Sequence, residues 1–126
     1  MREVHTDDAP DALGPYSQGI VDGDRLFVSG QGPLDPESGD VVSEDVREQT
    51  ARTLENVGAI LEAGEASFDD VVKSTVFVTD MDDYEAVNEV YGDYMTEPYP
   101  ARSAVEVGRL PAPISVEIEV IASLRE

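Results

Sequence analysis

Residues 71–78 carry the strongest strand signal in this chain, and they are Val71, Val72, Lys73, Ser74, Thr75, Val76, Phe77 and Val78. The segment is rich in β-branched residues, and it is nearly continuous in apolar character toward its end. Such a run favours a strand that is buried on both faces. We therefore expect residues 71–78 to lie centrally in a sheet.

A long helix is expected before this strand. Apolar residues recur at three-to-four spacing from Val46 to Leu61, which is the pattern of a helix that packs by one face. Ser43 is suited to be its N-cap, and Gly64 is a plausible C-cap.

A second helix is expected after the strand. Asp82 and Glu85 resemble a capping box, and Pro98 and Pro100 stop the helix. Its apolar stripe consists of Tyr84, Val87, Val90, Tyr91 and Tyr94.

The remaining strands are expected near the two ends of the chain. A short N-terminal strand precedes a hairpin of residues 18–21 and 26–29, and the chain closes with strands near 101–107 and 115–122. The order βββαβαββ predicts one α+β domain over residues 1–126, with a mixed sheet of about six strands and both helices on one face. The uncovered face then needs another subunit, since residues 71–78 supply apolar side chains to both sides.

The segment from Pro100 to Pro111 contains the most informative polar residue, Arg102. Side chains alternate along a strand, so Ala104 and Glu106 share the face of Arg102, which we expect to leave the apolar face. A guanidinium is permanently charged and matches a carboxylate bidentately, which indicates an acid-binding site. The alternative is an arginine that pairs with a nearby glutamate, such as Glu106, and stabilises an interface.

Glu117, in the next strand, is the second candidate. A carboxylate shielded among Val116, Ile118 and Val120 is expected to have a raised pKa suited to proton transfer. In a simple hairpin of the last two strands, Glu117 would pair near Glu106, about 13 Å along the strand from Arg102. Either those strands are not neighbours, or the site is assembled across subunits.

The whole pattern resembles the signature of the RidA/YjgF family of reactive-intermediate deaminases. Similar blocks occur in order at residues 14–19, 27–31, 34–36, 72–78, 87–91, 100–111 and 116–119. The resemblance implies a chorismate-mutase-like fold and a homotrimer with active sites between subunits. It also implies hydrolysis of 2-iminobutanoate and 2-iminopropanoate to 2-keto acids and ammonia, with no cofactor or metal.

The resemblance assigns roles to individual residues. It makes Arg102 the carboxylate anchor and Glu117 the group that activates water. The substrate-binding positions are Tyr16, Ser29, Gly30, Gln31, Asn88 and Ala104. Ala104 stands where many family members have cysteine, which favours chemistry by water and excludes a thiol at this position.

The amino-acid composition disfavours several classes of function. The chain of 126 residues has 28 acidic and 8 basic residues, a net charge of −20, and Lys73 as its only lysine. The acid excess disfavours nucleic-acid binding and suggests adaptation to a high-salt cytoplasm, because salt screens self-repulsion. There is no cysteine, one histidine (His5) and no apolar run long enough to cross a bilayer, so we expect no metal site and a cytoplasmic protein without a membrane partner.

Two other functions stay open at this point. One is a non-catalytic module of the same fold that binds a 2-keto acid or similar metabolite through Arg102. The other is a ribonuclease or translation inhibitor, a role attached to some members of the family, and the acidic composition argues against it.

Overall fold

The computed structural model describes residues 1–125. Its strands are β1 (Arg2–Val4), β2 (Gly19–Asp22), β3 (Arg25–Gln31), β4 (Val71–Val78), β5 (Ala101–Glu106) and β6 (Val116–Ser123). Its α-helices are α1 (Val46–Ala63) and α2 (Tyr84–Tyr94), and short 3₁₀ turns lie at Phe68–Asp70 and Met81–Asp83. The predicted order βββαβαββ is confirmed.

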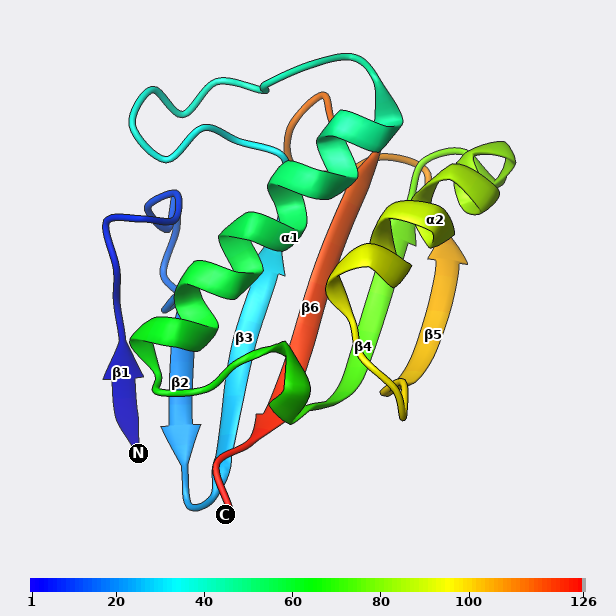
Figure 1. Cartoon of the computed structure of the whole chain (residues 1–126). Helices are drawn as coiled ribbons and strands as arrows, with labels where there is room; N and C mark the ends of the chain where they lie inside the picture. Colours follow the sequence, from blue (N-terminus) through cyan, green and yellow to red (C-terminus); the bar gives the residue numbers. More distant parts are fainter. Residues whose placement is uncertain (126) are drawn as a thin grey trace.

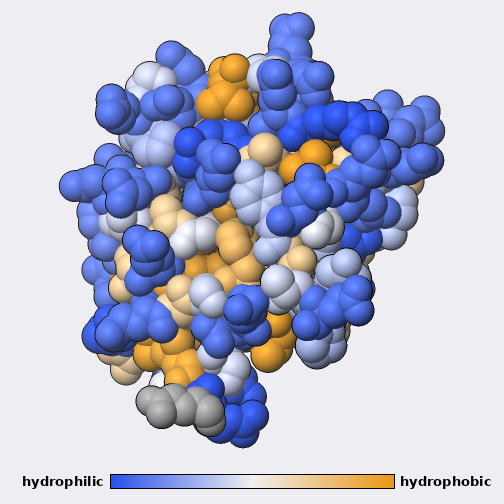
Figure 2. Space-filling model, viewed as in Figure 1, coloured by the Kyte–Doolittle hydropathy of each residue, from blue (hydrophilic) through white to orange (hydrophobic). Residues whose placement is uncertain are grey.

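The strands form one mixed sheet in the order β1-β2-β3-β6-β4-β5. Strand β4 pairs with β5 in parallel, and every other pair is antiparallel. Both helices lie on one face of this sheet, α1 over β3 and β6 and α2 over β4 and β5 (Figure 1). This confirms the predicted fold class. Seen from the helix side, hydrophilic residues make up most of the surface, with apolar residues in patches between them (Figure 2).

Strand β4 has the predicted bounds and lies inside the sheet, but β6 separates it from β3. Its side chains alternate in burial: Ser74, Val76 and Val78 are buried under the helices, and Thr75 and Phe77 are half-buried on the other side. The expectation of a strand covered on both faces is therefore wrong for the single chain. The second face of β4 has no layer over it within residues 1–125.

That uncovered face is apolar along one line. Ile20, Phe27 and Ile121 are in register across β2, β3 and β6, and Lys73 of β4 follows Ile121. Phe27 is 43% exposed, although phenylalanine is usually buried. Ile20 and Ile121 are half-buried, so the row is a partly exposed apolar surface, and such surfaces occur at interfaces with other proteins.

The N-cap of helix α1 lies two residues later than expected. Asp45 is the N-cap, and its Oδ1 accepts hydrogen bonds from the backbone N–H groups of Arg47 (2.7 Å) and Glu48 (3.3 Å). Ser43 instead accepts a hydrogen bond from the N–H of Asp45, which shapes the turn before the cap. Gly64 is the C-cap as predicted, and a Cβ at this position would lie 2.6 Å from Leu26 Cδ2. Glycine therefore allows the end of α1 to approach β3.

Helix α2 lacks the predicted capping box. Its N-cap is Asp83, whose side chain makes no capping hydrogen bond, and Asp80 caps the preceding 3₁₀ turn by accepting from the N–H of Asp82. Asp80 thus accepts from the Asp82 N–H, the donor that the capping box would have paired with Glu85. No helix within residues 1–125 is both long enough and apolar enough to span a membrane.

Candidate active site

Arg102 lies on the helix side of edge strand β5. It is opposite Ser74, which is buried against α2, and Ala104 on the same face packs against the core. The expectation that Arg102 leaves the apolar face is therefore wrong. At the sheet edge the guanidinium of Arg102 packs on two aromatic rings of α2. Its Cζ atom is 4.8 Å from the ring centre of Tyr91 and 5.5 Å from the ring centre of Tyr84.

Among the described residues 1–125, no carboxylate neutralises the guanidinium of Arg102, because no acidic side chain there lies within ion-pair distance of it. Glu106 on the same face accepts a hydrogen bond from the N–H of Met81 (2.7 Å), so the structure does not support the alternative pair of Arg102 and Glu106. Arg102 keeps its charge available for an external acid.

Asn88 lies beside Arg102 at a cleft of about 310 Å³. The buried Oδ1 of Asn88 has no hydrogen-bond partner within the described part of the chain. Most buried polar atoms in proteins have a partner, so this oxygen is suited to a donor from a ligand or a neighbouring subunit. We call this space the arginine cleft, and its lining residues are Asn88, Tyr91, Gly92, Tyr99, Pro100 and Arg102.

Glu117 lies on the opposite face of the sheet, next to a β-bulge. The register of β3 and β6 shifts between Val28 and Gln31, which leaves Ser29 and Gly30 as the bulged residues. A Cβ on Gly30 would lie 2.3 Å from Glu117 Oε2, so the carboxyl group occupies the space that only glycine leaves open. Bulges of this kind often re-aim side chains beside active sites.

The environment of Glu117 favours proton transfer. Burial, and then the neighbouring carboxylate of Glu119, raise the pKa of Glu117 above its usual value. A carboxyl group with a raised pKa keeps its proton to a higher pH than an ordinary glutamate does, which suits an exchange of protons with a substrate. The sequence predicted this shift from the apolar neighbours of Glu117.

A cleft of about 480 Å³ borders this carboxyl group, and we call it the glutamate cleft. Tyr16, Ser29 and Gly30 line it together with Glu117. Apolar side chains form much of the remaining wall: Leu13, Leu34, Pro111, Ala112 and Ile114. The hydroxyl of Tyr16 accepts a weak hydrogen bond from the N–H of Leu13 (3.4 Å), and Ser29 Oγ donates to the carbonyl of Ser17 (2.6 Å).

Two predicted site residues, Gln31 and Ala104, line neither of the two clefts. The side chain of Gln31 is 6% exposed, and its Nε2 donates to the carbonyls of Ser29 (3.2 Å) and Gly30 (3.3 Å). In this structure Gln31 supports the bulge from behind. The side chain of Ala104 contacts the core.

The predicted site residues thus form two groups on opposite faces of one sheet. Strand β4 separates β5 from β6, and Phe77 is opposite both Val105 and Glu117. Glu117 is therefore about 10 Å beyond Arg102 along the strands, two strands away and on the other face. One chain does not bring Arg102 and Glu117 together.

Tyr84 and Tyr91 contact Arg102 but were predicted only as part of an apolar stripe. Tyr84, Asn88 and Tyr91 follow each other at spacings of four and three residues, so α2 presents all of them on one face. The polar residue Asn88 between two tyrosines of that stripe was the feature of the sequence that could have indicated a binding site. Only the contact of α2 with β5 shows that these tyrosines pack on Arg102.

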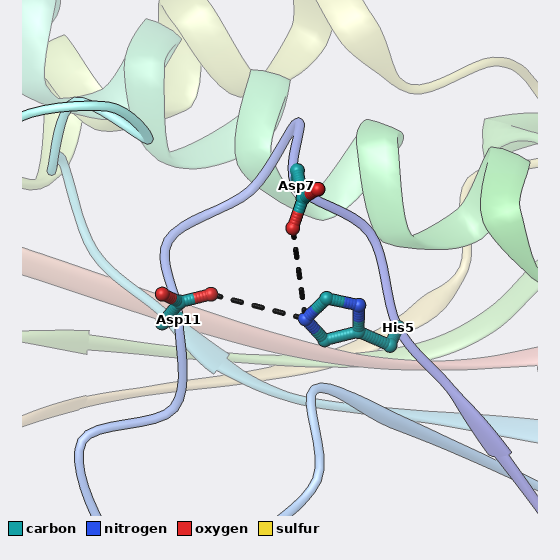
Figure 3. A group of neighbouring side chains, drawn as sticks. All are labelled: His5, Asp7 and Asp11. Carbon is teal, nitrogen blue, oxygen red and sulfur yellow. Dashed lines mark ion pairs between the residues drawn. The ribbon is translucent and has the colours of Figure 1, made fainter.

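His5 is the one histidine, and it lies between two carboxylates in an exposed N-terminal segment (Figure 3). Its Nε2 is 3.9 Å from Asp7 Oδ1 and 3.8 Å from Asp11 Oδ1. All of these side chains are exposed to solvent, as is usual for acidic surface groups. They lie apart from both clefts.

The fold and the two clefts place this chain in a class of small α+β proteins, and the structures of several similar proteins in this class have been solved. The profile of the Endoribonuclease L-PSP family matches residues 6–124. The structure of Escherichia coli TdcF with bound serine aligns with a TM-score of 0.92 at 43% identity, and covers 98% of each chain.

Curated relatives agree with this class. A RutC family protein of Pyrococcus horikoshii is 51% identical over 123 residues, covering 97% of this chain and 98% of the relative. A 2-iminobutanoate/2-iminopropanoate deaminase of Salmonella typhimurium is 47% identical over 127 residues, covering 98% of each. The chain belongs to the RidA/YjgF family, as its sequence motifs suggested.

Proposed function

We propose that this protein hydrolyses 2-imino acids, such as 2-iminobutanoate and 2-iminopropanoate, to 2-keto acids and ammonia. The observation that carries the proposal is Arg102, a guanidinium at the edge of a cleft that has no ion pair within residues 1–125. Two relatives support the proposal. The similar protein of Salmonella typhimurium is named as this deaminase. The structure of TdcF contains bound serine, and serine resembles an imino acid because its carboxylate is attached to the carbon that bears the nitrogen.

In the proposed reaction Arg102 binds the substrate carboxylate through two parallel N–H donors. This fixes the C=N carbon relative to the water that attacks it, and such positioning lowers the barrier. The unpartnered Oδ1 of Asn88 accepts a hydrogen bond from the imine N–H.

Glu117 moves the protons. As a base it takes a proton from the attacking water while the oxygen adds to the C=N carbon, and it gives that proton to the imine nitrogen, so that a carbinolamine forms. It then takes the hydroxyl proton of the carbinolamine and passes it to the amino nitrogen, so that the C–N bond breaks, the C=O bond forms and ammonia leaves. No electrons are exchanged with an outside group, so side chains and water are sufficient.

The complete site is proposed to lie between two copies of the chain. Since Arg102 and Glu117 are on opposite faces of one sheet, a second copy has to supply the missing half. The apolar row of Ile20, Phe27 and Ile121 supports association through the uncovered face. A closed homotrimer with three equivalent sites satisfies both requirements.

The test measures ammonia and 2-keto acid release in molar KCl from imines that an amino-acid oxidase generates in the assay. Wild type is expected to exceed spontaneous hydrolysis, and Arg102→Ala is expected to lose this acceleration while keeping its oligomeric state. Arg25→Ala is the matched control, because Arg25 pairs with Asp24 at the β2–β3 turn, away from both clefts. Acceleration retained by Arg102→Ala would refute the proposal.

The arginine cleft favours one alternative, because Arg102 and Asn88 are together without Glu117. Such a half-site could bind a 2-keto acid without turnover. Tight, Arg102-dependent binding of 2-oxobutanoate by a wild type that does not hydrolyse imines would support this ligand-binding function. RNA cleavage, which the family description names, is disfavoured by the net charge of −20.

A further inference from the structure

Tyr84 makes the one hydrogen bond that the side chain of Arg102 forms within residues 1–125. Arg102 Nη2 donates to the hydroxyl of Tyr84 at 2.9 Å. The Tyr84 ring is also 5.5 Å from the guanidinium carbon, so the same residue contacts Arg102 through its face and its hydroxyl. Tyr84 is 38% exposed and opens α2, which means that burial in the core does not explain its position.

The second tyrosine near Arg102 is held differently. Tyr91 is 6% exposed, and its hydroxyl shares a hydrogen bond of 2.6 Å with Ser74 Oγ. Ser74 is the residue of β4 that pairs with Arg102. Tyr91 is therefore fixed by the core and supplies a rigid wall. The orientation of the guanidinium along that wall depends on Tyr84.

We propose that Tyr84 is a positioning residue that holds the Arg102 guanidinium in the orientation that binds a carboxylate. The inference rests on the proposed function, in which Arg102 is the carboxylate anchor. An arginine side chain has many rotamers, and bidentate recognition requires one of them. By holding Nη2, Tyr84 leaves the other N–H donors free to face the arginine cleft.

The same contact gives the binding of acids a pH dependence. The Asn88 side chain, one turn along α2, and the Arg102 guanidinium lower the pKa of Tyr84. Above that pKa the phenolate is an anion against Arg102 and competes with the carboxylate of a ligand. Two charged side chains of β5, Arg102 and Glu106, face the start of α2 near Tyr84. Glu106 accepts a hydrogen bond from the backbone N–H of Met81. The acidic neighbours along the chain are Asp82, Asp83 and Glu85.

The experiment compares Tyr84→Phe with wild type, because phenylalanine keeps the ring and removes the hydroxyl. The matched control is Tyr94→Phe, which removes another α2 hydroxyl bonded to a charged side chain, Glu55 (3.2 Å). We measure KM and kcat for imine hydrolysis, and the Kd of 2-oxobutanoate by calorimetry from pH 7 to pH 9.5.

For Tyr84→Phe we expect KM and Kd to rise about tenfold at pH 7 with little change in kcat, and Tyr94→Phe to match wild type. The Kd of wild type is expected to rise toward pH 9.5, whereas that of Tyr84→Phe stays flat. A purely structural role would not produce this difference in pH profile. Unchanged KM, Kd and pH profile in an active protein would overturn the role of Tyr84 and leave the proposed function standing.

Failure of the proposed function has a different signature. A wild type that does not hydrolyse imines but binds 2-oxobutanoate through Arg102, and more weakly as Tyr84→Phe, would keep Tyr84 as a positioning residue for a binding site. A wild type that neither hydrolyses imines nor binds 2-oxobutanoate would overturn both.

Discussion

At the scale of single residues, Glu117 links function to stability. Its pKa is raised in the folded protein, so the folded state holds this proton to a higher pH than the unfolded chain does. Stability therefore falls as the pH rises through the folded pKa, and above that pKa the ionised carboxylate destabilises the fold.

Glu117→Gln is accordingly expected to lose activity by about 10²- to 10⁴-fold, because it removes the proposed proton-transfer group. The same variant should gain stability relative to wild type at pH 7 and lose that advantage near pH 4. Activity assays and thermal unfolding at both pH values check the prediction. A fully active variant, or one less stable than wild type at pH 7, would contradict it.

At the scale of elements, the bulge of β3 places the Glu117 carboxyl group. Gly30→Ala would put a Cβ 2.3 Å from Oε2 and 2.8 Å from Cδ of Glu117, so this flexible side chain has to move. The fold should survive, because the displaced atoms are the end of a side chain. We expect a loss of activity of about tenfold or more with a small change in melting temperature.

Gly108→Ala is the control for that change, since a Cβ at Gly108 meets no atom within 4 Å. It is expected to keep both activity and stability. Equal activity of Gly30→Ala and Gly108→Ala would show that the position of the carboxyl group does not matter.

At the scale of the whole molecule, the opposite faces of Arg102 and Glu117 predict complementation between copies. Arg102→Ala and Glu117→Gln should each be inactive as pure oligomers. In oligomers assembled from equal amounts of both, each site pairs one copy's Arg102 with the next copy's Glu117, and about one quarter of wild-type activity is expected. Analytical ultracentrifugation measures the assembly. A mixture no more active than its components would argue against sites shared between subunits.

The net charge of −20 is also a property of the whole molecule. Self-repulsion of this size should weaken the folded state at low salt, and a Debye length of about 3 Å near 1 M salt should relieve it. We expect the urea midpoint to be higher in 2 M KCl than in 0.1 M KCl at constant oligomeric state. Equal or greater stability at low salt would rule out adaptation to a high-salt cytoplasm.

The sequence by itself determined the elements, because helix and strand periodicity are local properties. Residues 71–78 form the strand that their composition predicted, and both helices follow their apolar stripes. It also singled out Arg102 and Glu117, and it predicted the raised pKa of Glu117 from its neighbours. Local patterns were less informative about where a helix starts. Asp45, not Ser43, caps α1, because the geometry of the side chains decides between two candidates that lie two residues apart.

Only the tertiary structure decided how these elements meet. Strand β6 pairs between β3 and β4, so the last two strands are not neighbours, and Arg102 and Glu117 lie on opposite faces. It also brought Tyr84 to Arg102 across 18 residues of sequence. Strand order and contacts of this kind depend on burying apolar surface between distant segments, which no local periodicity encodes.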